Sequence, residues 1–306
     1  MRPIHVFLAT CVAVIWGLAY VATKIALGSF SPPQLTVLRF LIACAPALLL
    51  PRPRVPVRML VLIGMTMFTG QFLLQFFGIA NGMPPGLASV VSQTQGMFTV
   101  VLAVLFLKER PGGRQLVGLV SGLAGLAVVG MTVGNGLTTL GLLLVLASAI
   151  SWSIGNVLLK TLQRVDMLHL VVWMSLVPPL PAFAISAFTD GPGSLPHALA
   201  VAPWQALASA LYLGLVATVL AYAIWGKLLR TYTAAAVTPF ALLAPCIGAI
   251  SSAIVFGEQF TPLRLLGMAG ILLGVAIVVL PLDRVARAIF GPLASKQIED
   301  KPAGSP

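Results

Sequence analysis

The chain has 306 residues, of which 59% are hydrophobic and only 8% are charged. Its mean hydropathy is +1.04. Soluble domains contain about 25% charged residues, so this composition excludes a soluble enzyme, a disordered chain and a nucleic-acid-binding domain. The net charge of +11 does not indicate a nucleic-acid partner, because the basic residues lie in short gaps between apolar segments. We therefore expect an all-α integral membrane protein that contacts the lipid bilayer.

Ten apolar segments follow one another, each close to the roughly 20 residues that a membrane-spanning helix needs. They are residues 4–26, 34–50, 58–80, 85–107, 114–133, 138–160, 167–188, 204–226, 233–256 and 263–281. Prolines between 178 and 181 interrupt the seventh segment. The first segment is longer than the apolar region of a signal peptide, so we expect it to remain as a helix.

The basic residues predict the orientation of the chain. If the N-terminus is cytoplasmic, the cytoplasmic segments contain 15 of the 18 Lys and Arg residues, the outer segments contain only Lys24 and Arg264, and Arg39 lies within the second span. Basic residues favour the cytoplasmic side, so we expect both termini there and a disordered cytoplasmic tail at 283–306. The lack of a transit peptide before the first span and of long soluble loops favours the bacterial inner membrane.

Matching patterns in the two halves of the chain indicate an internal repeat. The first pattern, Trp16 with Lys24, recurs 136 residues later as Trp152 with Lys160. A second pattern recurs at an offset of 149 residues, and its members are Glu109, Gly118 and Gly125, then Glu258, Gly267 and Gly274. The difference between the offsets predicts an insertion in the second half, in the Gly/Pro-rich loop around 189–203.

We therefore predict two five-helix repeats, residues 1–135 and 136–282. Because five is an odd number, the second repeat enters the membrane from the opposite side. Inverted repeats of this kind are common in secondary transporters, whose substrate site lies near the middle of the bilayer between the repeats.

With these motifs the chain resembles the EamA-like branch of the drug/metabolite transporter superfamily over residues 4–282. The positions that carry the resemblance are Trp16-Gly17, Lys24, Arg39, the segment 106–110 with Gly118, and the segment 256–258 with Gly267. The resemblance implies ten helices, alternating access and the export of small metabolites. Within the family the chain is most similar to bacterial exporters of aromatic and other neutral amino acids.

Polar and aromatic residues recur at helical spacing within several segments, which puts them on shared helix faces. Polar side chains are costly in lipid unless they face protein or water, so these faces predict a wet central cavity; hydrogen bonding between helices is the alternative. The expected substrate-binding residues are Trp16, Tyr20, Gln71, Gln75, Ser89, Gln93, Trp152, Asn156, Tyr222 and Trp225. Neutral amides, hydroxyls and aromatic rings suit a neutral or zwitterionic small molecule.

Charged residues near the ends of the spans have two interpretations. Lys24, Lys160 and Arg39 are predicted to be gate residues or to attract a substrate carboxylate, and the alternative is anchoring at the membrane interface. Glu109 and Glu258 end the fourth and ninth segments, and we expect a structural role in which each carboxylate anchors a helix end or accepts hydrogen bonds from the N-terminus of the next helix.

Small residues in the last two helices of each repeat predict close packing or bending. Gly118 and Gly122 form one GxxxG motif, and Gly270 and Gly274 form another, beside Gly267. Such motifs allow helices to approach closely, either within the chain or in a homodimer. Gly96 and Pro245 correspond at an offset of 149 residues, and both are hinge candidates.

The sequence predicts no cofactor, metal site or enzymatic activity. It lacks the DDxxD, GxSxG and HExxH motifs of membrane-embedded enzymes, and we expect Cys11, Cys44 and Cys246 to be buried small residues rather than disulfide or metal partners. The predicted function is export of small neutral metabolites, mainly aromatic and other neutral amino acids. The alternatives are a channel-like facilitator, a carrier of sugars, purines or drug-like solutes, or a membrane-embedded enzyme.

The charge distribution yields a prediction about topology. Tags fused to either terminus should be accessible only from the cytoplasm, because both ends belong to the basic side of the chain. Labelling of intact and of permeabilised cells measures this accessibility. A C-terminal tag that reacts in intact cells would contradict the ten-span topology.

Overall fold

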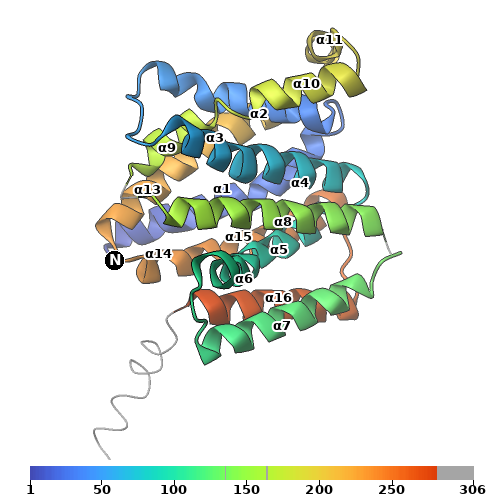
Figure 1. Ribbon diagram of the computed structural model, residues 1–306. Coiled ribbons are helices and arrows are strands. Elements are labelled where there is room, and N and C mark those ends of the chain that lie inside the picture. The colour runs from blue at the N-terminus through green and yellow to red at the C-terminus, as the bar shows by residue number, and fades with distance from the viewer. Residues whose placement is uncertain (135, 163–164, 281–306) are drawn as a thin grey trace, which may run out of the picture.

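The computed structural model describes residues 1–134, 136–162 and 165–280, and their regular structure is entirely helical (Figure 1). The α-helices are α1 (Pro3–Ala26), α2 (Pro32–Cys44), α3 (Val57–Ile63), α4 (Gln71–Ala80), α5 (Pro85–Val91), α6 (Gln95–Leu107), α7 (Gly113–Gly130), α8 (Thr139–Lys160), α9 (Met167–Met174), α10 (Pro179–Thr189), α11 (Ser194–Val201), α12 (Trp204–Leu211), α13 (Ala221–Thr231), α14 (Ala234–Ala241), α15 (Leu243–Phe256) and α16 (Pro262–Val279). The predicted tail at 283–306 lies outside the described residues.

Short stretches of other helix types join these elements into spans. Two 3₁₀ segments, Ala45–Leu48 and Ser92–Thr94, follow α2 and α5, and two π-helical segments, Gly64–Gly70 and Tyr212–Leu220, continue α3 into α4 and α12 into α13. In the described part of the chain, nine continuous helical stretches are long and apolar enough to cross a membrane. The remaining predicted span, the second, is the shorter apolar helix Pro32–Leu48, so the ten predicted segments are all helical.

The second half contains one helix that the sequence analysis placed in a loop. Residues around 189–203 include α11 (Ser194–Val201), which lies after two glycines with positive φ, Gly191 and Gly193. Pro196 did not prevent this helix because it lies in the first turn, where the missing N–H has no intrahelical partner to lose. The interruption predicted in the seventh span is present between α9 and α10, at Pro178.

The two halves share irregular features at equivalent positions. In the first π-helical segment the Thr69 hydroxyl donates to the carbonyl of Gly64 at 3.4 Å, and in the second the Thr218 hydroxyl donates to the carbonyl of Leu213 at 2.8 Å. Both bonds reach back five residues, and the two threonines differ by 149 positions, like Glu109 and Glu258. The fold is therefore the inverted repeat that the sequence predicted, and α11 lies in the predicted insertion.

Spans four and nine are both broken near their middle. The 3₁₀ turn Ser92–Thr94 separates α5 from α6 just before Gly96, and α14 gives way to α15 at Leu242, just before Pro245. The hinge candidates thus lie beside real interruptions of helical geometry. Motion at these points remains a prediction.

The glycine motifs of α7 and α16 pack against each other within the chain, at the edge of the bundle opposite α2 and α10 (Figure 1). A Cβ atom at Gly118 would lie 2.7 Å from the carbonyl oxygen of Gly274, and one at Gly267 would lie 2.8 Å from that of Gly125. Backbone therefore meets backbone along this contact. The GxxxG motifs thus serve packing within the chain, the first of the two alternatives. A homodimer remains a prediction.

The three cysteines are free thiols, but none is buried as the sequence predicted. Cys11 and Cys44 are half-buried and Cys246 is exposed. In a membrane bundle an apolar residue can face lipid as readily as protein, so an apolar segment does not by itself predict burial.

The contact between α7 and α16 yields a stability prediction. Gly125→Ala should destabilise the protein by about 1–3 kcal/mol, because its Cβ would lie 2.5 Å from the backbone nitrogen of Ile271. The matched control is Gly130→Ala in the same helix, where a Cβ meets nothing within 4 Å. Thermal unfolding of the purified protein in detergent measures the difference. Equal melting temperatures for both variants would show that the contact tolerates a side chain.

Candidate functional site

The two repeats enclose a central cavity of about 460 Å³. Equivalent residues of the first helix of each repeat line it: three on α1, and on α8 the three residues that lie 136 positions later. These are Trp16, Tyr20 and Thr23 on α1, and Trp152, Asn156 and Leu159 on α8. The cavity therefore lies between the two repeats, where many secondary transporters bind their substrates.

A buried cation, Arg39, lies at this cavity. Its predicted position was near the end of a span, but it lies in the middle of α2 and is only 4% exposed. Its guanidinium carbon is 3.9 Å from the ring centroid of Phe72 and 5.7 Å from that of Phe40, close enough for cation–π attraction. Its Nε donates to the Thr218 hydroxyl at 3.2 Å. No carboxylate forms an ion pair with it among the described residues.

Packing of aromatic rings holds this arginine in place. The ring of Phe40, the residue after Arg39, stacks on Phe68 with centroids 5.0 Å apart and contacts Phe72 at 5.4 Å. Phe40 and Phe68 are almost fully buried. Because the rings fix α2 against the third span, the guanidinium has a defined position at the cavity wall.

Two glutamines add a chain of amides to the wall. The Gln71 side-chain NH₂ donates to the Gln75 carbonyl oxygen at 3.1 Å, and the Gln75 NH₂ donates to the Ser92 hydroxyl at 3.4 Å. This direction leaves the Gln71 carbonyl oxygen, Oε1, buried and without a hydrogen-bond partner in the described structure. An unsatisfied buried acceptor costs about 1–3 kcal/mol, so the site offers a place for a hydrogen-bond donor.

Aromatic side chains form another part of the wall. The Trp16 ring lies 5.4 Å from Tyr222 and 5.1 Å from Trp225, measured between ring centroids, and its indole N–H donates to the carbonyl of Ala217 at 3.1 Å. Trp152 lies on the α8 side of the cavity. These rings present apolar surface with fixed orientation to a bound molecule.

Nine of the ten predicted substrate-binding residues line this cavity, and Ser89 does not. The Ser89 side chain is completely buried, and its hydroxyl donates to the carbonyls of Gly86 at 2.6 Å and Pro245 at 3.0 Å. The residue 149 positions later, Thr238, lines the cavity instead. The two halves of the cavity therefore differ, although the sequence repeat is symmetric.

Several residues that line the cavity were not predicted from the sequence, among them Phe68, Phe72 and Met174. A phenylalanine that faces a cavity and one that faces lipid look the same in an apolar segment. One signal was available: Phe68 and Phe72 share the helix face of Gln71 and Gln75, at spacings of three and four residues.

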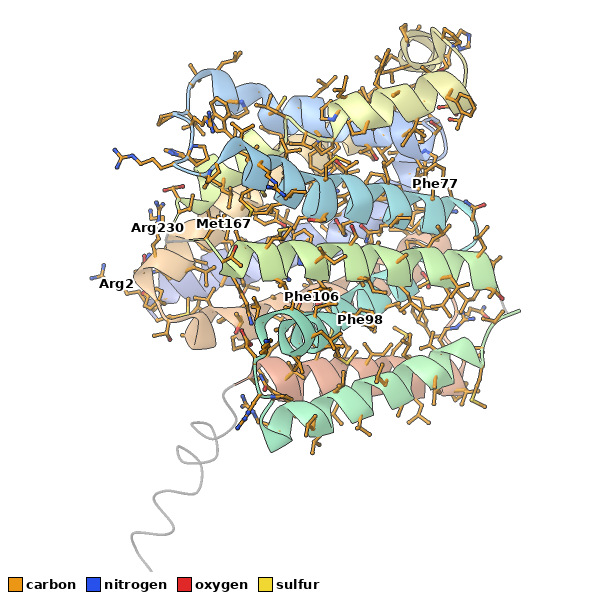
Figure 2. The ribbon with its side chains drawn as sticks, in the orientation of Figure 1. Arg2, Phe77, Phe98, Phe106, Met167 and Arg230 are labelled. Atoms are coloured by element: carbon orange, nitrogen blue, oxygen red, sulfur yellow. The ribbon has the colours of Figure 1, made fainter. Side chains whose placement is uncertain are left out.

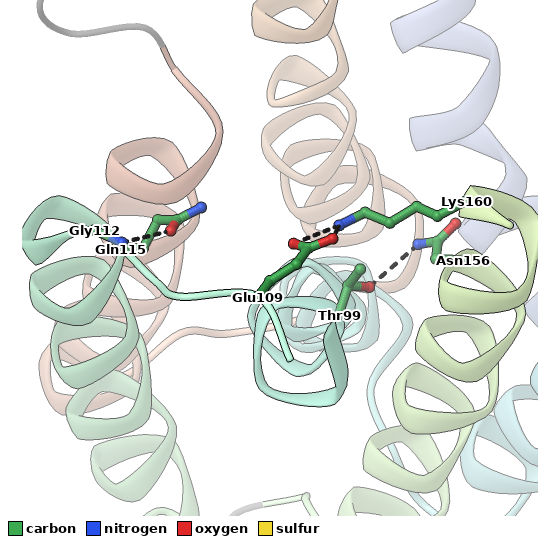
Figure 3. Close-up of polar contacts among 6 residues, drawn as sticks. All are labelled: Thr99, Glu109, Gly112, Gln115, Asn156 and Lys160. Atoms are coloured by element: carbon green, nitrogen blue, oxygen red, sulfur yellow. Dashed lines mark hydrogen bonds and ion pairs between the residues drawn. The ribbon is translucent and has the colours of Figure 1, made fainter. Parts of the chain in front are cut away.

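The lysines predicted as gates do not line the cavity. The Lys160 ammonium binds both carboxylate oxygens of Glu109 at 3.1 Å, and the two side chains are 45% and 50% exposed (Figure 3). Beside this pair, the Asn156 amide donates to the Thr99 hydroxyl at 3.3 Å (Figure 3). Lys24 is exposed and forms no ion pair within the described residues. Neither lysine is positioned to contact a molecule in the cavity.

Glu258 has the structural role that the sequence predicted, but with another helix. Its carboxylate accepts hydrogen bonds from the backbone N–H groups of Gly86 at 2.9 Å and Leu87 at 3.1 Å, and from the Ser252 hydroxyl. Gly86 and Leu87 begin α5, in the other repeat. The carboxylate thus joins the two repeats at the face of the bundle away from the N-terminus.

The face that carries the N-terminus is held by a different set of bonds. Asp166 accepts from the N–H groups of Leu168 and His169 at the start of α9 and forms an ion pair with Arg230 at the end of α13. Burial raises the pKa of Asp166, but the two backbone bonds and the positive charge of Arg230 outweigh it, so the pKa lies below its ordinary value. Figure 2 shows Met167 and Arg230 at the same end of the bundle as Arg2.

A membrane bundle of inverted repeats around a polar and aromatic cavity is typical of secondary transporters. The chain belongs to the EamA-like transporter family, whose model matches residues 3–131 and 139–280. It is a multi-pass protein of the bacterial inner membrane, and membership indicates a transporter of small molecules.

Named relatives are similar over most of their length. The chain is 38% identical over 277 residues to a probable amino-acid metabolite efflux pump of Escherichia coli, covering 88% of this chain and 93% of that protein. It is 38% identical over 278 residues to the protein of that name in Salmonella typhimurium, covering 89% and 93%. A probable terminal-alkyne amino-acid exporter of Streptantibioticus cattleyicolor is 28% identical over 278 residues, covering 85% of this chain and 89% of that protein.

A solved crystal structure has the same fold. It superimposes with a TM-score of 0.61 at 19% sequence identity, and the alignment covers 94% of this chain and 99% of the other. At this level of identity the similarity supports the fold alone.

The cavity yields a prediction about its tryptophans. Trp16→Ala and Trp152→Ala should each lower kcat/KM for transport at least about tenfold, because burying an aromatic side chain against a ligand contributes about 1.5–3 kcal/mol. Trp204→Ala is the matched control, since Trp204 is 74% exposed and remote from the cavity. Flux into proteoliposomes at equal protein content measures the effect. Wild-type flux in both cavity variants would place the substrate elsewhere.

Proposed function

We propose that this protein exports small neutral amino acids, aromatic and apolar ones above all, by alternating access. The observation that carries the proposal is Arg39, a buried cation at the cavity wall that has no carboxylate partner in the described residues. The carboxylate of a bound substrate would pair with the Arg39 guanidinium and neutralise its charge.

The energetics of burial favour this assignment. A buried charge is costly unless it is paired and hydrogen-bonded. In Arg39 the Nε is bonded and one face of the guanidinium lies over Phe72, but no hydrogen bond is formed by its two terminal nitrogens in the described structure. A guanidinium binds a carboxylate through two parallel N–H bonds with strict geometry, so the terminal nitrogens form a specific carboxylate site.

The remaining lining fits the rest of an amino acid. The free carbonyl oxygen of Gln71 can accept a hydrogen bond from an ammonium group, and the rings around Trp16 and Tyr222 can hold an apolar or aromatic side chain. The volume of about 460 Å³ lies within the roughly 300–1,000 Å³ of small-molecule sites. A phosphorylated substrate would need several cations, whereas Arg39 alone supplies positive charge among the lining residues.

The direction of transport is proposed from the relatives. Two of them are named as probable amino-acid metabolite efflux pumps and a third as a probable amino-acid exporter. The closed contact between Glu258 and α5 at one face supports a carrier over a channel-like facilitator, because an open pore would need both faces free at once.

The role of Arg39 is tested by comparing a neutral amino acid with its amide. Wild-type protein should transport phenylalanine and discriminate strongly against phenylalanine amide, because only the acid carries a carboxylate. Arg39→Gln should lower kcat/KM for the acid about 10- to 100-fold, the usual effect of losing a hydrogen bond to a charged group, and leave the amide nearly unchanged.

The amide serves as an internal control for folding, since both substrates are measured on one preparation in proteoliposomes. If Arg39→Gln protein still prefers the acid, the carboxylate does not bind at Arg39, and the proposed substrate class fails. If neither substrate moves through wild-type protein while another solute does, the amino-acid assignment fails as well.

A further inference from the structure

The two repeats carry the same charged residues at their helix ends but use them differently. Lys160 at the end of α8 binds Glu109, which follows α6. The residues that correspond to them by the repeat offsets are Lys24 at the end of α1 and Glu258, which follows α15. Within the part of the chain that the structure describes, Lys24 and Glu258 form no ion pair; Glu258 binds the start of α5 instead. The sequence is symmetric at these four positions, and the contacts are not.

The cavity has the same asymmetry. On the side of the N-terminal face it reaches Leu159 near the end of α8, Met167 at the start of α9 and Thr238 in α14. Toward the opposite face, spans one, four and nine close over it. A Cβ at Gly248 would lie 2.6 Å from that of Ser89, and one at Gly17 would lie 2.8 Å from the carbonyl oxygen of Ala244.

Each contact belongs to one side of this asymmetry. The bond between Glu258 and α5 lies within the closed face, where a Cβ at Gly86 would meet Glu258 and Phe260 within 3.0 Å. The pair of Glu109 and Lys160 lies at the N-terminal face, with both side chains about half exposed. At the closed face the carboxylate of Glu258 thus accepts from backbone N–H groups, and at the open face the carboxylate of Glu109 binds a lysine.

We propose that Glu109 and Glu258 are the two latches of the transport cycle, and that each alternates between the partner repeat's helix and a lysine. When the face away from the N-terminus opens, Glu258 leaves α5 and binds Lys24. At the same time Glu109 leaves Lys160 and binds the start of span nine, the position that corresponds to the start of α5. The inference rests on the alternating access of the proposed function, but not on the substrate.

Exchange of partners explains why charged residues are needed at these positions. A carboxylate that left backbone N–H groups without a new partner would lose the free energy of charge-assisted hydrogen bonds. A nearby lysine offsets part of that loss, so the two states of each gate differ little in free energy and both can be populated. A fixed anchor would need only one of the two partners.

The test measures the populations of the two states and needs no transported substrate. Ser89→Cys, in a protein whose three native cysteines are replaced by serine, reports opening of the face away from the N-terminus, because Ser89 is fully buried in the present state. The rate of its reaction with a hydrophilic maleimide is measured in detergent and in proteoliposomes. Thr238→Cys, which lies on the cavity wall, is the mirror-image reporter.

Two variants with the same chemical change should shift the reporter in opposite directions. Lys160→Gln removes a partner used only in the present state, so the Ser89→Cys reaction should become about two- to fivefold faster, the range expected for a half-exposed ion pair. Lys24→Gln removes a partner used only in the other state, so the reaction should become slower by a similar factor. Thr238→Cys should show the reverse order.

A charge swap separates a latch from a loss of folding. Lys160→Glu combined with Glu109→Lys keeps the ion pair of the present state but leaves no carboxylate at position 109 to accept N–H bonds at the start of span nine. The Ser89→Cys reaction should therefore be slower than in the parent protein, opposite to the effect of Lys160→Gln, whereas a loss of folding would make it faster in both. Unchanged rates in both single variants, or shifts in the same direction, would overturn the proposal and leave the lysines as interfacial anchors. A failure of the amino-acid transport assay would not affect these rates, so the two proposals can fail separately.

Discussion

The lack of hydrogen-bonding partners in hydrocarbon is the constraint on which this structure depends. A polar side chain inside the membrane is stable only when it faces protein or enclosed water, so the amides, hydroxyls and the guanidinium of this chain converge on one cavity between the repeats. The aromatic rings of Phe40 and Phe72 then hold Arg39 in a buried position at the cavity wall. Burial strengthens its attraction for an anion, and that attraction is the basis of the proposed substrate recognition.

Much of the fold and of the cavity could be predicted from the sequence because both follow from helical spacing. A spacing of four residues puts Trp16 and Tyr20 on one helix face, and Trp152 and Asn156 on another. Both faces line the cavity. The prediction that Arg39 lies near the end of a span was wrong. Hydropathy shows that a span is present, but it does not locate the middle of a short span such as α2. The α11 helix was missed because proline weakens a helix everywhere except in its first turn.

Ser89 shows a different limit, because the alternating access that we propose needs two states and a structure contains one of them. Its repeat equivalent, Thr238, lines the cavity, while Ser89 is enclosed between the carbonyls of Gly86 and Pro245. The sequence repeat therefore predicts every residue that could line the cavity in either half, including those that are enclosed in this structure. Which half is open is decided by small free-energy differences between contacts, and these have no signature in residue spacing.

The glycine contact between α7 and α16 also has a consequence for biosynthesis. These are the last helices of the two repeats, and their backbones touch along Gly118, Gly125, Gly267 and Gly274. Until α16 leaves the ribosome, the glycine stripe of α7 has no complementary surface and must face lipid, which cannot fill so narrow a groove as well as another backbone does. The first repeat therefore waits, inserted but incompletely packed, for the final span, and a chain that stops before residue 262 lacks the surface that completes both halves.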